Sequence, residues 1–423
     1  SARRVSTALA IGCFIPPTLR RGTPKMSDTR PSFFNMRILH TSDWHLGRSL
    51  HQQDLHAAQA GAMQQIVEIA RSQRVDVTIV AGDVFDRAVP PVEAVSLFVA
   101  TLQQLAEHCV VIVISGNHDS AVRLGYGAEL FRQGIHIATS VESVGNGIDV
   151  AIGDETARIF PIPFLLPDQA RDALKTGDEP LPRSHEAVLG AALERVRANL
   201  ATEATPPTTS IVIAHAFVTG ARESDSERDI SVGGVEDVNA TIFSGIDYVA
   251  LGHLHGPQEI RGPADTVIRY SGSPLRYSFS EAQHAKSVTV VDVDGSGACV
   301  IDEVPIIQPR PMVVLTGSLD EVLSEANQTE HSNAWAQVVV TDDARPIDLT
   351  NRVRAAYPHA LSILHRPTNP PATIGVQSDA LVARAPTEIA SEFVLAVTNR
   401  PTTDSEATVL RDVYESVRNR VDS

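Results

Sequence analysis

The sequence predicts a layered α/β fold with a small second α/β domain, and three observations support it. From residue 36 onward, short β-branched runs alternate with stretches of helical periodicity. The early apolar runs each end in a cluster of Asp, His, Asn or Gly residues. A second alternation of strands and helices follows a proline-containing linker near residue 310. We therefore expect a main domain over 36–306, a second domain over 307–380 and a helix pair over 381–423.

The elements of the main domain follow from the spacing of apolar residues and from turn signals. Helices are expected at 54–72 and 90–108, where apolar residues recur at helical spacing and Pro90-Pro91 lie near the first turn of the second helix. The β-branched runs that we assign to strands are 37–43, 75–83, 110–119, 157–164, 210–218 and 247–255.

The remaining part of the chain holds a hairpin, the second domain and two helices. Residues 287–306 are expected to form a hairpin around Asp294-Gly295. The pattern over 312–366 is that of strand, helix, strand, helix and strand. Residues 386–423 have the apolar spacing of two amphipathic helices, and the second opens with Thr403 and Glu406 at the spacing of a capping box.

The composition limits the classes of protein to consider. No run of eighteen apolar residues occurs, so no membrane span is expected. The three cysteines, Cys13, Cys109 and Cys299, lie far apart, which favours a reducing, cytoplasmic compartment without disulfides or a thiolate metal site. A net charge of −16 argues against a protein that coats nucleic acid by bulk attraction, although nucleic acid remains possible as a substrate.

The first 35 residues differ from the rest of the chain, because they carry arginines and prolines and show little periodicity. We expect a disordered leader or a start codon assigned too early, with the folded chain beginning near Met36. A secretory signal is disfavoured because Pro16-Pro17 interrupt the apolar run and no A-x-A site comes after it.

The polar ends of the predicted strands carry the chemistry. Ligands bind at the carboxyl ends of strands in open α/β sheets, so these ends should converge on one site. Carboxylates, imidazoles and an amide suit Mn²⁺, Fe²⁺ or Zn²⁺ better than Mg²⁺ or Ca²⁺. The ligands exceed what one ion needs, which favours two ions about 3.5–4 Å apart with one bridging carboxylate. The residues are Asp43-x-His45, Gly82-Asp83-x-x-Asp86, Gly116-Asn117-His118-Asp119, His215 and Gly252-His253-x-His255.

Each of these pieces alone has a simpler explanation. A single D-x-H at a strand end is usually a turn with a surface histidine, and GNHD can be a tight turn that needs the positive φ of glycine. A buried histidine such as His215 is more often satisfied by hydrogen bonds than by a metal. By strand alternation His40 lies one position away from the site, and we expect it to be structural. The joint occurrence of all the pieces at strand ends is what favours a metal site.

In this order the motifs resemble those of the calcineurin-like metallophosphoesterases. Longer runs are similar to the narrower SbcD family, the nuclease subunits of bacterial SbcC–SbcD complexes. These runs are HTSDWHLGR, AGDVFDR, SGNHDSAVRLG, ALGHLHGPQ and YSGSPLRYSFSE. The resemblance covers residues 36–423. It implies a layered β-sandwich flanked by helices, a small α/β capping domain and a C-terminal helix pair that binds a partner.

The resemblance also implies a role for each motif residue. It implies that the first metal is held by Asp43, His45 and His255, and that Asp83 bridges the two metals. The second-metal ligands that it implies are Asn117, His215 and His253.

Other motif residues are expected to act without binding metal. His118 would orient or protonate the scissile phosphate and its leaving group, while water activated by the metals attacks phosphorus in line. Asp86 and Asp119 would orient imidazoles. The arginines in or beside the motif loops are either phosphate contacts or surface ion pairs; these are Arg48, Arg87, Arg123 and Arg276.

At the level of function, the resemblance implies a DNA nuclease with two Mn²⁺ ions that acts in repair, recombination and replication. It would be an exonuclease on duplex ends and an endonuclease on hairpins and single strands. An SbcC-like coiled-coil ATPase and a homodimer of the nuclease domain are the implied partners. One alternative is a stand-alone metal-dependent phosphatase or nucleotide phosphodiesterase. A non-catalytic scaffold is the other, but such a protein should have lost ligands, and every motif position is filled.

Overall fold

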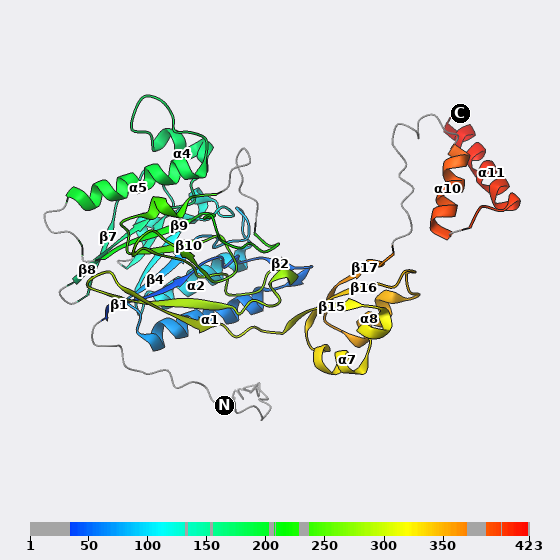
Figure 1. Ribbon diagram of the computed structural model, residues 1–423, viewed down its shortest axis with the longest axis horizontal. Helices are drawn as coiled ribbons and strands as arrows, with labels where there is room; N and C mark the ends of the chain where they lie inside the picture. Colours follow the sequence, from blue (N-terminus) through cyan, green and yellow to red (C-terminus); the bar gives the residue numbers. More distant parts are fainter. Residues whose placement is uncertain are drawn as a thin grey trace, which may run out of the picture. The chain divides into compact units, whose positions relative to one another are not determined.

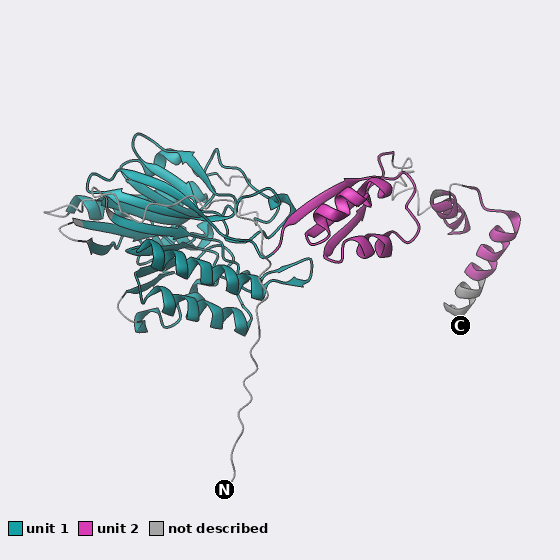
Figure 2. Ribbon diagram, turned by 90° about the horizontal axis from the view of Figure 1, so that it is seen from below, with its two compact units in different colours: residues 1–309 teal, residues 310–423 magenta. Residues whose placement is uncertain are grey.

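The protein is described by a computed structural model that forms two compact units, residues 1–309 and 310–423 (Figure 2). The expectation for residues 1–35 lies outside the described part of the chain, apart from Phe34 and Asn35. Most of the proline-rich segment after residue 366 lies outside it as well. The described residues are 34–131, 134–152, 155–202, 207, 209–227, 237–369, 386–398 and 400–421.

The first unit contains a six-stranded sheet in the order β14-β13-β1-β4-β5-β6 among its described residues. Figure 1 labels β1 and β4 of this sheet. β1, β4, β5 and β6 run parallel, and β13 and β14 form an antiparallel edge. The predicted hairpin is therefore this edge. The bounds are β1 (Phe34–Thr41), β4 (Val77–Ala81), β5 (Val110–Ile114), β6 (Ile135–Ala138), β13 (Ser287–Asp294) and β14 (Cys299–Pro305).

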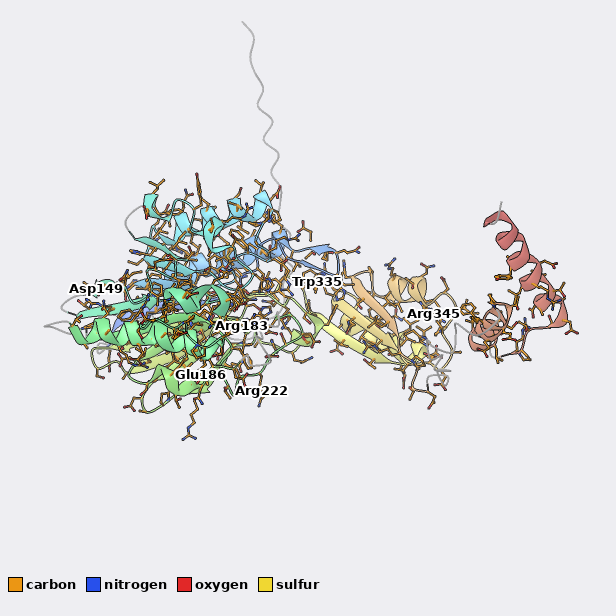
Figure 3. The ribbon with its side chains drawn as sticks, turned by 90° about the horizontal axis from the view of Figure 1, so that it is seen from above. Asp149, Arg183, Glu186, Arg222, Trp335 and Arg345 are labelled. Carbon is orange, nitrogen blue, oxygen red and sulfur yellow. The ribbon has the colours of Figure 1, made fainter. Side chains whose placement is uncertain are left out.

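A second six-stranded sheet, in the order β11-β12-β10-β9-β8-β7, faces the first. Four parallel strands lie at its centre, with β7 and β11 antiparallel at its edges. Asp149 on β7, which is labelled in Figure 3, binds the Arg158 guanidinium of β8 at 2.6 and 2.8 Å, and this holds one edge strand in place. The bounds are β7 (Ile148–Ile152), β8 (Glu155–Pro161), β9 (Thr209–His215), β10 (Tyr248–Gly252), β11 (Gln258–Arg261) and β12 (Val267–Tyr270).

Apolar side chains from both sheets fill the space between them. Ile38 and Ile79 come from the first sheet, and Ile211, Ile213 and Tyr248 come from the second, all with no exposed surface. Burying an isoleucine side chain of this size stabilises the folded state by roughly 1.5–3 kcal/mol. Because interiors are close-packed, this core fixes the two sheets against each other and therefore fixes the positions of their strand ends.

Helices cover the outer faces of both sheets, so the first unit is a sandwich flanked by helices. α1 (His56–Gln73) and α2 (Val92–Leu105) pack together on the side of the first sheet. α5 (His185–Thr202) buries Val188, Ala192 and Val196 against the second sheet. Figure 1 shows α4 and α5 on the side opposite to α1. The layered α/β fold class predicted from the sequence is confirmed.

Several short elements complete the first unit, and the sequence did not predict α4, α5 or the strands β6, β7, β11 and β12. A small hairpin, β2 and β3, follows the first strand, and single turns of helix connect later strands. Their bounds are β2 (Ser49–Leu50), β3 (Gln53–Asp54), α3 (Ala121–Leu124), α4 (Pro167–Ala173), η1 (Ala128–Leu130), η2 (Ala240–Phe243) and η3 (Phe279–Glu281).

The second unit contains a parallel three-stranded sheet in the order β15-β16-β17. Its own apolar core includes Leu315, Val338, Val353 and Tyr357. The bounds are β15 (Met312–Gly317), β16 (Trp335–Val340), β17 (Ala360–His365), α6 (Leu319–Val322), α7 (Glu325–His331), α8 (Leu349–Ala356), α10 (Pro386–Thr398) and α11 (Asp404–Val421).

Local capping explains the helix boundaries in the second unit. The sequence predicted a single helix between the first two strands of this unit, but Ser318 and Ser324 each cap a separate short helix, α6 and α7. The capping box predicted at the start of α11 is present: the Glu406 carboxylate accepts from the Thr403 backbone N–H at 2.9 Å. No helix in the described part of the chain is both long and apolar enough for a membrane span.

Candidate metal centre

The site is formed where five strands from the two sheets end. The parallel strands β1, β4 and β5 lead into Asp43, Asp83 and Asn117. The parallel strands β9 and β10 of the facing sheet end at His215 and just before His253. The sheets meet closely here, because His215 Nδ1 lies 2.9 Å from the carbonyl oxygen of Ala81 on β4. The carboxyl ends of the strands therefore meet, as expected from the sequence.

The backbone at the site adopts conformations that L-residues rarely use. Asp43, His45 and Asp83 have φ values of 54°, 43° and 49°, and His253 has φ 109°. Such residues cost on the order of 1–3 kcal/mol each and persist only where the surroundings hold them. Two hydrogen bonds do so here: Asp43 N–H donates to Gly82 O, and His45 N–H donates to Asp83 O, both at 3.0 Å.

One group of donors joins the ends of β1 and β10. Asp43, His45 and His255 each place a ligand atom within 4.8 Å of the others, and all three are buried. The Nε2 atoms of His45 and His255 lie 3.0 Å apart. Two imidazole nitrogens that face each other across a buried pocket are a suitable pair of ligands for one cation.

The Asp83 carboxylate lies at the centre of the cluster. Its Oδ2 lies 3.6 Å from His45 Nε2, 3.6 Å from His215 Nε2 and 3.9 Å from His118 Nε2. Its Oδ1 accepts the backbone N–H of His118 at 2.9 Å, which holds the carboxylate in place. Asp83 thus has ring nitrogens from the strand ends of both sheets around one of its oxygens.

A further set of donors surrounds Asn117. Its Oδ1 lies 2.9 Å from His215 Nε2 and 3.3 Å from His253 Nδ1. Its buried Nδ2 has no hydrogen-bond partner among the described residues. The amide therefore directs its oxygen towards the two histidines, and this oxygen is the atom that can bind a cation.

The protonation of these groups suits cation binding. Burial lowers the pKa of His45, His215 and His253, so the rings are neutral and keep a lone pair for a metal. Burial, and then the charge of Asp83, raise the pKa of Asp43 well above its usual value. The buried carboxylates of Asp43 and Asp83 place ligand atoms within 4.8 Å of each other. Two such negative charges repel each other unless a counter-charge lies between them, and a divalent cation supplies one. The donor set therefore fits a divalent metal.

Hydrogen bonds at the Nδ1 atoms, on the side away from the pocket, fix the rings of two further imidazoles. His118 Nδ1 lies 2.7 Å from the carbonyl oxygen of Asp86, so its Nε2 faces the pocket. His255 Nδ1 lies 2.7 Å from Ser226 Oγ and 3.2 Å from Glu281 Oε1. Reasoning from the sequence missed Ser226 and Glu281. A sequence signal existed only for Glu281, which is the last residue of the family-like run YSGSPLRYSFSE at 270–281.

Asp119 and Asp86 are both expected to orient imidazoles, and their contacts differ. The Asp119 carboxylate accepts backbone N–H groups of Gly116 at 2.9 Å, Val84 at 3.1 Å and Phe85 at 2.9 Å. It therefore joins the loop after β4 to the loop after β5. Burial, and then Asp83, raise its pKa to about 7. The Asp86 carboxylate lies 3.9 Å from His45 Nδ1, too far for a hydrogen bond, and only its main-chain oxygen orients an imidazole.

The arginines singled out from the sequence lie in different environments. The Arg48 guanidinium lies over the Tyr277 ring at 5.3 Å and donates to Ser226 O at 3.2 Å. Arg276 is half-buried and donates to the carbonyl oxygen of His284 at 2.9 Å, so its guanidinium is committed within the protein. Arg87 and Arg123 are exposed. A phosphate contact stays a prediction for all four.

His40 is structural, as predicted. Its Nδ1 lies 2.9 Å from the Tyr248 hydroxyl and its Nε2 lies 3.1 Å from the carbonyl oxygen of Leu251. Burial lowers its pKa to about 3. Both ring nitrogens are engaged within the core, so neither is available to a metal.

Comparison with known proteins identifies the class. Residues 36–257 match the sequence profile of the calcineurin-like phosphoesterases. Residues 308–398 match a second profile, SbcD_C, described as the type 5 capsule protein repressor C-terminal domain. The fold, the donor cluster and these matches define a metal-dependent phosphodiester hydrolase. The clusters of donors support divalent metal binding.

Two relatives narrow the class to a particular family. The SbcD subunit of the SbcCD nuclease from Bacillus subtilis (strain 168) is 36% identical over 337 residues, which cover 78% of this chain and 85% of that protein. The corresponding SbcD subunit from Staphylococcus epidermidis is 30% identical over 331 residues, with the same coverage of 78% and 85%. The chain belongs to the calcineurin-like phosphoesterase family and, within it, to the SbcD nuclease subunits.

Among solved structures, a dimetal phosphatase from Danio rerio matches with 9% identity and a TM-score of 0.39. The match covers 65% of this chain and 98% of that chain. This TM-score is too low to bear on the site.

Replacement of Gly116 by alanine should disrupt the metal centre. A Cβ atom at this position would lie 2.2 Å from Asp83 Oδ1 and 2.3 Å from Asp83 N, so the carboxylate would have to move. We expect Gly116→Ala to weaken Mn²⁺ binding at least ~10-fold, the scale of losses seen when the support of metal ligands is removed. Calorimetric titration of metal-free protein measures this.

Gly190 supplies the matched control, because it lies in α5 and a Cβ there would meet nothing within 4 Å. Gly190→Ala should bind Mn²⁺ like the unmodified protein. Wild-type affinity in Gly116→Ala would contradict the close approach of the two loops.

Proposed function

We propose that this chain is a two-metal DNA nuclease that hydrolyses phosphodiester bonds at double-strand ends and hairpins, with Mn²⁺ as the cation. It would act as an exonuclease on duplex DNA and as an endonuclease on single strands, in repair, recombination and replication. The observation that carries the proposal is the Asp83 carboxylate, whose Oδ2 lies 3.6 Å from ring nitrogens of both sheets. One shared carboxylate between two sets of donors is the arrangement of a two-ion site.

The ligand assignment follows the two sets of donors. The first ion would be held by Asp43, His45 and His255, supported by the 4.8 Å grouping of their ligand atoms. Asp83 would be shared between the two ions. The ligands proposed for the second ion are Asn117, His215 and His253, supported by the approach of both imidazoles to the Asn117 oxygen.

Within this site His118 has the position of a general acid or an electrostatic clamp. When bound, the cations would supply Lewis acidity and lower the pKa of water. The His118 Nδ1–H donates to Asp86 O, which leaves Nε2 facing the pocket, 3.9 Å from Asp83 Oδ2. This nitrogen can hold a proton for the leaving oxygen or donate to a phosphoryl oxygen. Arg48 is the arginine that we propose to meet a phosphate, because its side chain is 17% exposed and its guanidinium lies 3.6 Å from the carboxylate of Asp86, the residue whose main-chain oxygen holds His118.

The activity is expected to be specific for DNA and to depend on His118. With Mn²⁺, the protein should cleave linear and hairpin-ended duplex DNA and should hydrolyse p-nitrophenyl phosphate and cyclic nucleotides far more slowly. A chelator should abolish cleavage. His118→Ala should lower turnover about 10²–10⁴-fold, because proton transfer by a positioned histidine contributes that much. Calorimetry should still find two bound ions in this variant.

His108 is an exposed histidine that serves as the control, and His108→Ala should retain wild-type turnover. Wild-type turnover in His118→Ala with both ions bound would contradict the role of His118. Preference for p-nitrophenyl phosphate over DNA would instead favour the stand-alone phosphatase.

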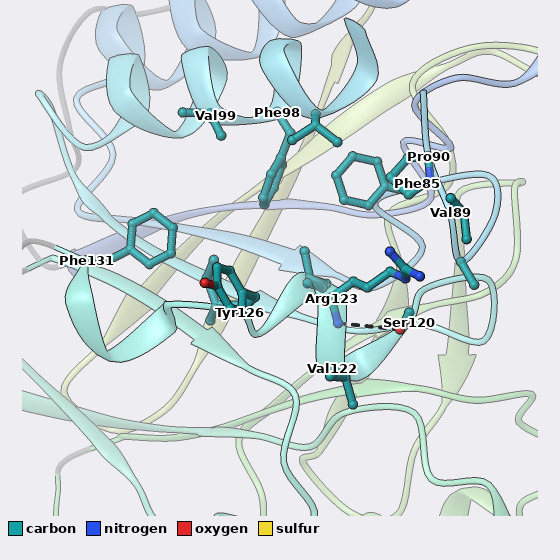
Figure 4. Close-up of a pocket in the computed structure, with 14 residues that line it drawn as sticks. Phe85, Val89, Pro90, Phe98, Val99, Ser120, Val122, Arg123, Tyr126 and Phe131 are labelled. Atoms are coloured by element: carbon teal, nitrogen blue, oxygen red, sulfur yellow. Dashed lines mark hydrogen bonds between the residues drawn. The ribbon is translucent and has the colours of Figure 1, made fainter. Parts of the chain in front are cut away.

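We further propose that two copies of the chain associate through the α2–α3 surface. This surface consists of Val92, Val95 and Val99 on α2, and of Val122, Tyr126, Leu130 and Phe131 after β5. Val122, Tyr126 and Leu130 are 84%, 86% and 88% exposed. An apolar groove lies between the two halves, with Phe98 and Val99 facing Tyr126 and Phe131 (Figure 4). Large apolar side chains gathered on one face are typical of an interface with another protein.

Charge placed on the α2–α3 surface should separate the two copies. Tyr126→Glu with Leu130→Glu would place two carboxylates in the interface, where desolvating them is unfavourable. We expect the unmodified protein to be dimeric by light scattering and this variant to be monomeric. Val300→Glu on β14 is the control, because Val300 is 51% exposed outside this surface. A monomeric unmodified protein would contradict the proposal.

The helix pair α10 and α11 is proposed to bind a coiled-coil ATPase of the SbcC kind. Phe393 and Val397 of α10 are 67% and 66% exposed, and Val409 and Val413 of α11 are 60% and 56% exposed. Each pair is spaced i, i+4, so it lies on one side of its helix. Such amphipathic helices commonly pack their apolar side against a partner helix.

Substitution on this apolar side should weaken the complex with the ATPase. Phe393→Glu with Val413→Glu should raise the Kd for a purified SbcC-like protein at least ~10-fold, because central apolar contacts dominate such interfaces. Biolayer interferometry measures this. Ser405→Glu is the control, since it adds charge to the exposed first turn of α11 without removing an apolar side chain. Unchanged affinity in the double variant would exclude this surface.

Two assignments follow from the same family membership. Residues 307–380 are proposed as a domain that caps the site and selects duplex DNA, supported by an apolar core of its own. Unchanged substrate selectivity after charge reversal on this domain would contradict that role. A cytoplasmic location is supported by the free thiols of Cys109 and Cys299. Recovery of the protein from another compartment would contradict it.

A further inference from the structure

A buried ion pair lies directly behind the proposed first-ion site. Lys286 Nζ lies 2.5 Å from Glu281 Oε2, and neither side chain has exposed surface. Charged residues are rarely buried completely, because removing them from water costs more than one contact returns. Such a pair persists where additional hydrogen bonds satisfy both groups, so its other contacts indicate its role.

Glu281 is joined to the ring of His255. Its Oε1 lies 3.2 Å from His255 Nδ1 and also accepts the Ser226 hydroxyl, which itself lies 2.7 Å from His255 Nδ1. A proton on Nδ1 is therefore held by two oxygens on the side away from the pocket. The opposite nitrogen, Nε2, is left with its lone pair towards His45 and Asp43.

Lys286 is joined to the main chain of the same histidine. Beyond Glu281, its ammonium donates to the carbonyl oxygen of His255 at 2.8 Å and to Ser273 Oγ at 2.8 Å. An ammonium group has three N–H donors, and two of them are used in these hydrogen bonds, while the ammonium also forms the ion pair with Glu281. The ion pair thus contacts both the ring and the backbone of His255.

The other proposed histidine ligands lack this kind of support among the described residues. His215 Nδ1 faces a neutral main-chain oxygen, that of Ala81. The nearest carboxylate oxygen to His45 Nδ1 is that of Asp86, at 3.9 Å. His255 is thus the proposed ligand whose ring is backed by a carboxylate at hydrogen-bond distance.

We infer that Glu281, paired with Lys286, is a positioning residue that fixes the ring and the Nδ1 proton of His255 and thereby sets the affinity of the first ion. The inference rests on the proposed function only in taking His255 as a ligand. A carboxylate behind a ligating imidazole holds its tautomer and orientation and raises its basicity. Lys286 balances the charge of Glu281, so the pair orients the His255 ring without adding net charge to the site.

A test must separate a loss of His255 positioning from a loss of folding stability. Removal of Glu281 or Lys286 alone would leave the other charge buried and unpaired, which destabilises the fold. Both charges are therefore removed together. Glu281→Gln with Lys286→Met keeps a neutral acceptor near His255 Nδ1, whereas Glu281→Leu with Lys286→Met removes the acceptor as well. Arg37→Met with Asp292→Asn is the matched control, since it removes a bidentate ion pair of 2.7 and 2.8 Å between β1 and β13, six residues before Asp43 along the chain.

The affinity of each ion is measured by titrating metal-free protein with Mn²⁺ in a calorimeter, and folding is checked by denaturant unfolding without metal. The variant with Glu281→Leu and Lys286→Met, called the Leu/Met variant, should lose about 10- to 100-fold in affinity for one of the two ions. This is the range of losses expected when a group that supports a metal ligand is removed. The variant with Glu281→Gln and Lys286→Met should lose less affinity for this ion. The control with Arg37→Met and Asp292→Asn should bind both ions with unchanged affinity. Wild-type affinity for both ions in a folded Leu/Met variant would overturn the inference and leave the nuclease proposal standing.

A different result would count against the proposed function itself. If the unmodified protein bound no pair of ions, both proposals would fail. If it bound two ions and the Leu/Met variant lost one, but DNA was not cleaved, the positioning role would hold and the DNA substrate would be wrong.

Discussion

The position of one carboxylate, that of Asp83, governs the organisation of this protein. Its Oδ2 must face His45 from the first sheet and His215 from the second at the same time. This is possible only if the two sheets keep a fixed separation and their strand ends stay aligned. The isoleucine core between the sheets provides that constraint, because close-packed side chains resist sliding. The layered fold is therefore a requirement of the site as well as its support.

The loops at the strand ends contain residues in unfavourable backbone conformations, and hydrogen bonds between neighbouring loops offset the free-energy cost of these conformations. Asp43, His45 and Asp83 have left-handed backbone conformations, which turn their side chains into the pocket. Hydrogen bonds from Asp43 and His45 to the loop after β4 hold these conformations. The Asp119 carboxylate then ties that loop to the one after β5 through three backbone N–H groups. Strain at the ligands is thus balanced by ordinary hydrogen bonds between neighbouring loops.

The sequence could predict the ligands because each follows a β-branched run, and parallel strands end at a common edge. It did not predict α5, although Val188, Ala192 and Val196 repeat at helical spacing there. Glu281 could not be found by periodicity, since its partner His255 lies 26 residues away along the chain. Asp119 was expected to orient an imidazole, and it directly follows His118 in the sequence. Adjacency in sequence does not show that its carboxylate points to the backbone of another loop.

Charge explains why the support of His255 is an ion pair and not a lone carboxylate. Asp43 and Asp83 already place two acidic groups in a buried pocket, and the whole chain carries a net charge of −16. Burial opposes ionisation of Glu281, but Lys286 and then His255 outweigh it and hold its pKa below the usual range. Glu281 can therefore stay ionised and accept a hydrogen bond from the His255 Nδ1–H without making the pocket more negative. This matters for an anionic substrate such as DNA, because every uncompensated carboxylate near the cations would repel the phosphate that the cations attract.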